Sequence, residues 1–166
     1  EENAALRYAA EYGHLDVVKV LLRYQAVVDN IAAEENAALR SATGNGHLEV
    51  VEVLLGYQAV RENVAVGRNA ALRYAAEHGH LDVVKVLLGC QAVRKNVAVG
   101  RNAALRYAAE YGHLDVVNVL LGYQAVVDDI AAEDNYALRW ACHHGHLGVV
   151  KVLLRYQAVR ENVAVD

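Results

Sequence analysis

The chain contains no proline, phenylalanine or methionine, and its only cysteines are Cys90 and Cys142. It has no paired-cysteine motif, no phosphate-binding glycine loop and no nucleophile elbow, so the common catalytic signatures are missing. It also has no Asn-x-Ser/Thr sequon. We therefore expect no enzyme, no cofactor and no resident metal. Free thiols without a glycosylation site fit a reducing compartment, and we expect the protein to be cytoplasmic.

Long apolar runs and single-sign charge are missing as well. No stretch approaches the roughly 18 apolar residues of a membrane helix, and no basic segment followed by an apolar one opens the chain. The net charge of -4 is spread over interspersed acidic and basic residues, so no basic stripe is available for nucleic acid. We expect neither a membrane nor a nucleic-acid partner. Because the first residue is not methionine, we expect the chain to be processed or excised from a longer one.

What is present is a repeat. The tripeptide Gly-His-Leu recurs every 33 residues without a gap, at Gly13-His14, Gly46-His47, Gly79-His80, Gly112-His113 and Gly145-His146. A fixed period of this length predicts stacked supersecondary units that share one core. Each unit opens at an asparagine, which gives repeats 3–35, 36–68, 69–101, 102–134 and 135–166. We expect residues 1–166 to form a single domain.

The third unit indicates how one repeat folds. Residues 70–78 are strong helix formers and stop at Gly79, which is typical of a helix end. Residues 81–88 place Leu81, Val84, Leu87 and Leu88 on one stripe at helical spacing. The alternation Val97-Ala98-Val99 predicts an extended excursion before the next unit. The two cysteines fall two units apart, too far for a disulfide.

This pattern resembles the ankyrin repeat. The family's motif Thr-Pro-Leu-His-x-Ala-Ala-x-x-Gly-His, followed by Val-Val-x-x-Leu-Leu-x-x-Gly-Ala-Asp, lies without a gap over residues 70–93. The resemblance implies an all-α solenoid of stacked helix-turn-helix units with projecting loops, and a protein partner bound on the concave face. The variant looks like the divergent arrays of intracellular bacterial effectors and large DNA viruses, for which the compartment is the host cytosol.

The loops depart from the family pattern. Its terminal Gly and Asp are replaced by glutamine (at 25, 58, 91, 124 and 157) and valine, so a β-finger is in doubt. In segments 29–35 and 128–134 glycine gives way to helix-favouring or capping residues, and we expect the next helix to begin early there, capped by Asp or Asn. Gly67-Arg68 and Gly100-Arg101 are expected to stay non-helical.

Candidate partner-binding residues are the aromatic ones that the core does not fix. Aromatic rings anchor interfaces because each buries a large rigid area and keeps a polar handle. In repeat two, a hollow between Tyr8 and Tyr74 is predicted from the residues that break the pattern, Ser41, Thr43, Gly44 and Asn45. Repeat five is expected to hold a hot spot. The candidates are Tyr8, Tyr12, Tyr74, His78, Tyr107, Tyr111, Tyr136, Trp140, His143 and His144. The alternative is that these rings only cover seams between stacked helices.

Two further columns have a structural interpretation. The histidine of each Gly-His pair is expected to hydrogen-bond loop backbone, because repeat spacing holds the imidazoles too far apart to share a metal. The column Arg7, Arg40, Arg73, Arg106 and Arg139 is expected to bind loop carbonyls, or Glu11, Glu77 and Glu110, although recognition of a carboxylate-rich or phosphorylated partner is an alternative. The cluster His143-His144-Gly145-His146 is the one place where a metal is conceivable.

Three functional hypotheses remain. The leading one is a non-catalytic protein-binding module; the others are a natural or engineered scaffold without a specific partner, and a targeting segment of a larger enzyme or effector. Because both ends expose surfaces that neighbouring repeats normally cover, we also expect end-to-end self-association at high concentration.

Overall fold

The computed structural model describes residues 3–163, and every regular element in that range is a helix. Each unit contributes three helices. The first helices are α1 (Ala4–Glu11), α4 (Ala33–Gly44), α7 (Val66–Glu77), α10 (Val99–Glu110) and α13 (Ala132–His143). The second are α2 (Leu15–Leu21), α5 (Leu48–Leu55), α8 (Leu81–Gly89), α11 (Leu114–Leu120) and α14 (Leu147–Leu153). The short third helices are α3 (Gln25–Asp29), α6 (Gln58–Glu62), α9 (Gln91–Lys95), α12 (Gln124–Asp128) and α15 (Gln157–Glu161).

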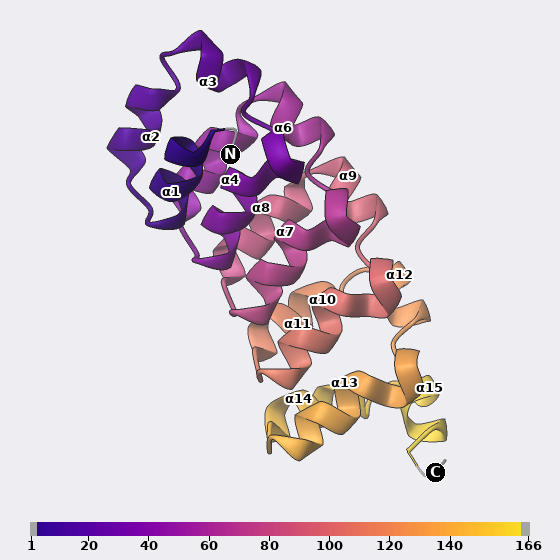
Figure 1. Ribbon diagram of the computed structural model, residues 1–166. Coiled ribbons are helices and arrows are strands. Elements are labelled where there is room, and N and C mark those ends of the chain that lie inside the picture. Colours follow the sequence, from indigo (N-terminus) through magenta and orange to yellow (C-terminus); the bar gives the residue numbers. More distant parts are fainter. Residues whose placement is uncertain (1–2, 164–166) are drawn as a thin grey trace.

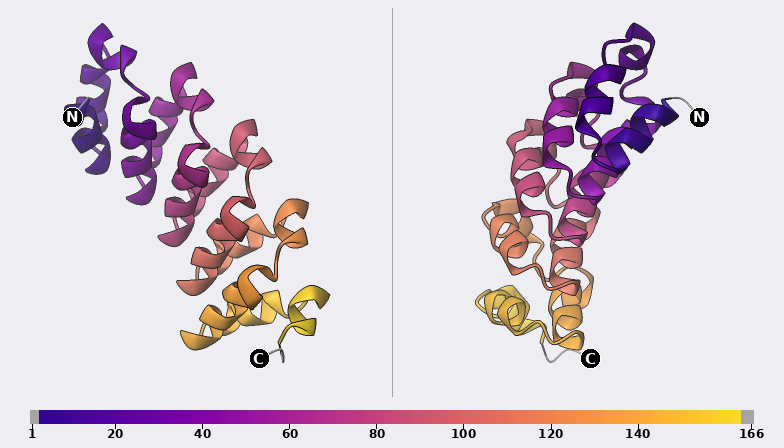
Figure 2. Two further views of the ribbon diagram at one scale, coloured as in Figure 1. Left: turned by 45° about the vertical axis from the view of Figure 1, so that its right-hand side comes forward. Right: turned by 90° about the vertical axis from the view of Figure 1, so that its left-hand side faces the viewer.

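The units stack in sequence order, which confirms the predicted all-α solenoid. First helices pack on first helices and second helices on second helices, while the short third helices follow one edge of the stack (Figure 1). The two termini lie at opposite ends of the stack, as Figure 2 shows from two sides. No helix between residues 3 and 163 combines the length and apolarity that crossing a bilayer requires.

The core runs continuously between the two rows of long helices. In repeat three, Leu72 of α7 and Leu87 of α8 are fully buried, and the predicted stripe also buries Val84 and Leu88. Each such side chain contributes about 1.5–3 kcal/mol on burial. Val83 was not on the predicted stripe, yet it is only 2% exposed. A second helix therefore buries two faces, one against its own unit and one against a neighbouring unit.

The extended excursion predicted at Val97-Ala98-Val99 is wrong. Val97 and Ala98 instead form a turn between α9, which starts at the glutamine that replaces the glycine of the ankyrin motif, and α10, which starts at Val99. Val93 and Val97 are 0% and 3% exposed. In a strand Lys95 would lie on the same face as these two valines, yet it is exposed, so this burial pattern favours helical turns over a strand.

The predicted difference between the two kinds of loop is also wrong. Three consecutive residues have left-handed backbone angles at every junction between units: 34–36, 67–69, 100–102 and 133–135. Right-handed helix resumes only after the asparagine that ends each triplet. α4 and α13 do begin inside segments 29–35 and 128–134, but the left-handed triplets interrupt them, and their N-caps are Ala32 and Ala131 and not Asp or Asn. The Gly-Arg junctions adopt the same conformation as the Glu-containing ones.

The asparagine that opens each unit explains why all the junctions share the same left-handed backbone conformation. Asn69 is 2% exposed, and its Nδ2 donates hydrogen bonds to the carbonyls of Val93 and Asn96, both at 3.0 Å. Asn102 makes the same pair of bonds to Val126 and Asp129. Asparagine tolerates the left-handed region better than most residues and here anchors the third helix of its own unit.

Candidate functional site

A row of aromatic side chains follows the first helices. Because these helices pack side by side, equivalent positions line up as Tyr8, Ser41, Tyr74, Tyr107 and Trp140. Tyr8 is 51% exposed, and the other three rings of this row are partly buried. One helical turn further on, Tyr12, His78, Tyr111, His143 and His144 are exposed, and Tyr136 near the start of α13 is partly buried. All ten candidate partner-binding residues thus reach the surface, on the first helices or directly after them.

The arginine column holds several of these rings. The guanidinium carbon of Arg7 lies 4.4 Å from the centre of the Tyr8 ring, and that of Arg73 lies 4.4 Å from Tyr74. Arg106 lies 4.7 Å from the ring of Tyr136 in the next unit. Cation–π contacts at these distances restrict the rings before any partner arrives. Sequence reasoning missed this role, although arginine directly precedes the aromatic position in four of the five units.

The same arginines also make the structural contacts expected of them. Arg40, Arg106 and Arg139 donate to the carbonyls of Glu35, Gly100 and Glu133 at 2.9, 3.2 and 3.0 Å. Arg7 and Arg73 form ion pairs with Glu11 and Glu77 at 3.7 and 3.9 Å. The expected partner of Arg106, Glu110, instead accepts a hydrogen bond from the Tyr136 hydroxyl at 2.9 Å.

Repeat five carries a compact aromatic cluster. The Trp140 ring lies 5.7 Å from Tyr136, 5.3 Å from His143 and 5.5 Å from His144, measured between ring centres. Burial, together with the bond to Glu110, raises the pKa of Tyr136 to about 12, so its hydroxyl stays protonated at neutral pH. A depression of about 220 Å³ opens beside Arg139, Trp140 and His143. The cluster offers a ring surface with a polar edge.

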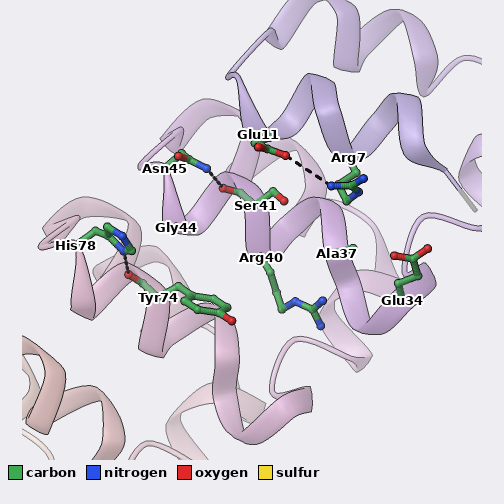
Figure 3. A pocket seen from close by; sticks show the side chains of 10 residues that line it. All are labelled: Arg7, Glu11, Glu34, Ala37, Arg40, Ser41, Gly44, Asn45, Tyr74 and His78. Atoms are coloured by element: carbon green, nitrogen blue, oxygen red, sulfur yellow. Dashed lines mark hydrogen bonds and ion pairs between the residues drawn. The ribbon is translucent and has the colours of Figure 1, made fainter. Parts of the chain in front are cut away.

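Repeat two presents the hollow that its sequence predicts. Its volume is about 560 Å³, and it lies over α4 between the side chains of α1 and α7 (Figure 3). Ser41 and Gly44 line it at the positions where repeats one, three and four carry a tyrosine and a glutamate. Tyr74 and His78 line one side, and Arg7 and Glu11 line the other. The Tyr8 ring itself is not part of the lining.

The histidine column has the structural role expected of it. His47, His80, His113 and His146 each place Nε2 2.9–3.0 Å from a backbone carbonyl of the preceding unit, so a neutral ring donates from this nitrogen. The same rings fill the space beside the glycine of the preceding unit. Burial lowers the pKa of His80, and the neighbouring imidazoles add to this effect. The column therefore locks adjacent repeats together.

The remaining reactive side chains do not assemble into a centre. Cys90 is partly buried and Cys142 is exposed, and both are free thiols, as expected. Burial raises the pKa of the Cys90 thiol. Between residues 3 and 163, no three histidine, cysteine, aspartate or glutamate side chains come together in a way that could hold a metal ion.

Comparison with known families agrees with this geometry. The family model described as ankyrin repeats (3 copies) matches residues 1–65 and 72–164. A helical solenoid with one such unit every 33 residues is a repeat protein whose exposed surface is the place to look for function. The chain belongs to the ankyrin-repeat family. Ankyrin repeats are generally protein–protein interaction modules and typically non-catalytic. A search of curated proteins finds no match to the chain.

Proposed function

We propose that this protein is a non-catalytic interaction module that holds a partner protein on the concave face formed by its first helices and the adjoining loops. The observation that carries the proposal is the row of rings from Tyr8 to Trp140, which is exposed in part. Arginine side chains contact three of its rings, Tyr8, Tyr74 and Tyr107. Rings that only covered seams between helices would be expected to lie flat and buried. Here Tyr8 of the row is 51% exposed, and Tyr12 and Tyr111, one helical turn beyond the row, are 65% and 51% exposed.

Restricted rings favour binding because less side-chain freedom is lost when a partner docks. Immobilising a mobile side chain costs about 0.5–1.5 kcal/mol, and the arginine contacts reduce that cost in advance. Repeat five combines the single tryptophan of the chain with Tyr136 and two histidines, and this composition is typical of an interface hot spot. We therefore assign the strongest single contribution to Trp140.

The test is affinity capture from a cell lysate with the wild-type chain and with the triple variant Tyr74/Tyr107/Trp140→Ala. Tyr24→Ala serves as the matched control, because Tyr24 is 62% exposed but precedes a third helix and lies outside the row. Circular dichroism establishes that all three proteins are helical before capture.

The proposal expects a protein that wild type and Tyr24→Ala retain and that the triple variant loses. Equal capture by all three would place the binding surface elsewhere. Background capture by all three would favour a scaffold without a specific partner, a hypothesis supported by the few differences between repeats three and four outside the loop.

A further inference from the structure

The hollow over repeat two lies where the row of rings is interrupted. In repeats one and three the arginine of the first helix lies 4.4 Å from the ring that follows it. In repeat two the corresponding pair is Arg40 and Ser41, and the Arg40 guanidinium contacts the Glu35 carbonyl and carboxylate instead. Three residues further on, Gly44 replaces the glutamate of repeats one, three and four. Two small residues on one face of α4 leave open the space that a ring fills in the neighbouring units.

We propose that this hollow accepts an aromatic side chain of the partner protein, which completes the row between Tyr8 and Tyr74. The inference rests on the proposed function and adds to it the chemistry of the partner. An inserted ring would meet the Arg40 guanidinium and the Tyr74 ring. In the next unit the Arg73 guanidinium likewise lies 4.4 Å from the Tyr74 ring and 5.7 Å from the Tyr107 ring. Both contacts are attractive for a ring.

The charge of the lining favours a neutral ring over an ionised side chain. Arg7 and Arg40 face Glu11 and Glu34 around the hollow, so the two signs balance. Arg7 is paired with Glu11 at 3.7 Å, and Arg40 is paired with Glu35 at 3.3 Å. A carboxylate or an ammonium group would have to compete with these existing pairs. A tyrosine or tryptophan brings apolar area and a polar edge without disturbing them.

The size of the hollow fits a side chain together with some backbone. Its volume of about 560 Å³ exceeds that of a single ring and lies in the range of pockets that hold small ligands, about 300–1,000 Å³. The polar part of the lining, with Asn45, Ser41 and Glu11, supplies hydrogen-bonding groups of the kind that fix a peptide backbone. The occupant is thus a short peptide segment of the partner, anchored by one ring.

The test uses a random peptide library displayed on phage and selected on the full chain. Recovered peptides are synthesised and titrated against wild type, Ser41→Tyr and Ser41→Ala. Ser41→Tyr fills the hollow with the residue that repeats one, three and four carry, so the variant is expected to fold, and circular dichroism checks this. Ser41→Ala is the matched control, because it removes the hydroxyl and leaves the hollow open.

We expect the selected peptides to share one aromatic position, and Ser41→Tyr to weaken their binding at least about tenfold while Ser41→Ala changes it less than about twofold. Aromatic peptides whose affinity is the same for Ser41→Tyr would overturn the proposal, as would recurrent aspartate or glutamate in place of the ring. Failure to select any peptide would also count against it. The proposed function is judged separately by the capture experiment, in which Ser41 is unchanged.

Discussion

Gly79 and Gly145 have the same left-handed backbone conformation but different surroundings. Their φ angles are +73° and +75°. A Cβ on Gly79 would lie 2.4 Å from Nδ1 of His113, whereas a Cβ on Gly145 would meet nothing within 4 Å. Both Gly→Ala variants lose about 1–2 kcal/mol because an L-residue is strained in this region. We expect Gly79→Ala to lose clearly more, since the His113 ring must also move.

Urea unfolding followed by circular dichroism measures the two losses. Gly145→Ala is the control, because it carries the backbone cost without the clash. Equal losses in both variants would mean that the imidazole moves aside without cost, and that the Gly-His contact does not lock adjacent repeats.

His80 makes stability depend on pH. Burial lowers its pKa from the ordinary 6.5, so the folded chain favours the neutral ring more than the unfolded chain does. The stabilising contribution is therefore complete above about pH 6.5 and is lost as the pH falls through that value towards the lower pKa of the folded state. We expect the thermal midpoint to fall on acidification, and to fall less in His80→Gln.

His14→Gln is the matched control for this prediction. His14 occupies the same position in repeat one and is exposed. Thermal unfolding monitored across this pH range should give wild-type behaviour for His14→Gln. A pH dependence that His80→Gln leaves unchanged would contradict the assignment to His80.

At the scale of elements, the junctions between units predict a pair of opposite substitutions. Glu34 and Gly67 are equivalent, with φ angles of 51° and 60°. Glycine adopts this region freely, whereas glutamate is strained there by about 1 kcal/mol. We expect Glu34→Gly to raise the free energy of unfolding by up to about 1 kcal/mol and Gly67→Glu to lower it by a similar amount.

Chemical denaturation of the two variants beside wild type provides the measurement, and each variant is the control for the other. The same sign of change in both would show that the left-handed strain at the junction is relieved in some other way.

The helices were predictable where the spacing of apolar residues alone determines them. They were not predictable where tertiary packing or a long-range hydrogen bond determines the backbone conformation. Leu81, Val84, Leu87 and Leu88 are spaced for a helix, and α8 forms there. The short helix α9 escaped prediction because the alternation at residues 97–99, which follow it, favours an extended segment. Burial of Val93 and Val97 with Lys95 exposed between them favours helical turns instead. The left-handed triplets escaped because the side-chain bonds of Asn69 reach 24 and 27 residues along the chain.

The candidate site was likewise predictable only in part. The hollow over repeat two followed from the small residues Ser41 and Gly44, since a missing side chain leaves space wherever its neighbours keep theirs. The packing of Arg106 on Tyr136 could not be predicted from the sequence, because these two residues are 30 positions apart in the chain and belong to different units. A space left by small residues can be inferred from the sequence of one unit, whereas contacts between units depend on how the stack is offset.

At the scale of the whole molecule, the two ends of the described chain expose positions that the interior buries. Val17 is 49% exposed, whereas the equivalent valines of the other four units, Val50, Val83, Val116 and Val149, are 1–2% exposed. At the other end Cys142 is exposed, whereas its equivalents Ala10, Thr43, Ala76 and Ala109 are 0% exposed. Leu147 is 62% exposed, and the space beside Gly145 is empty. These two surfaces are the two halves of the contact that recurs between the units of the stack.

We therefore expect the 166-residue chain to associate end to end, with the His14 ring of one copy entering the space beside Gly145 of the next. Such a contact is heterologous and continues without closing, so the mass should rise steadily with concentration. Val17→Lys places a charge in the contact and should keep the chain monomeric. Asn118→Lys adds the same charge at an exposed position of α11 and should behave as wild type. Light scattering over a concentration series measures the mass, and a wild-type chain that stays monomeric at high concentration would contradict the prediction.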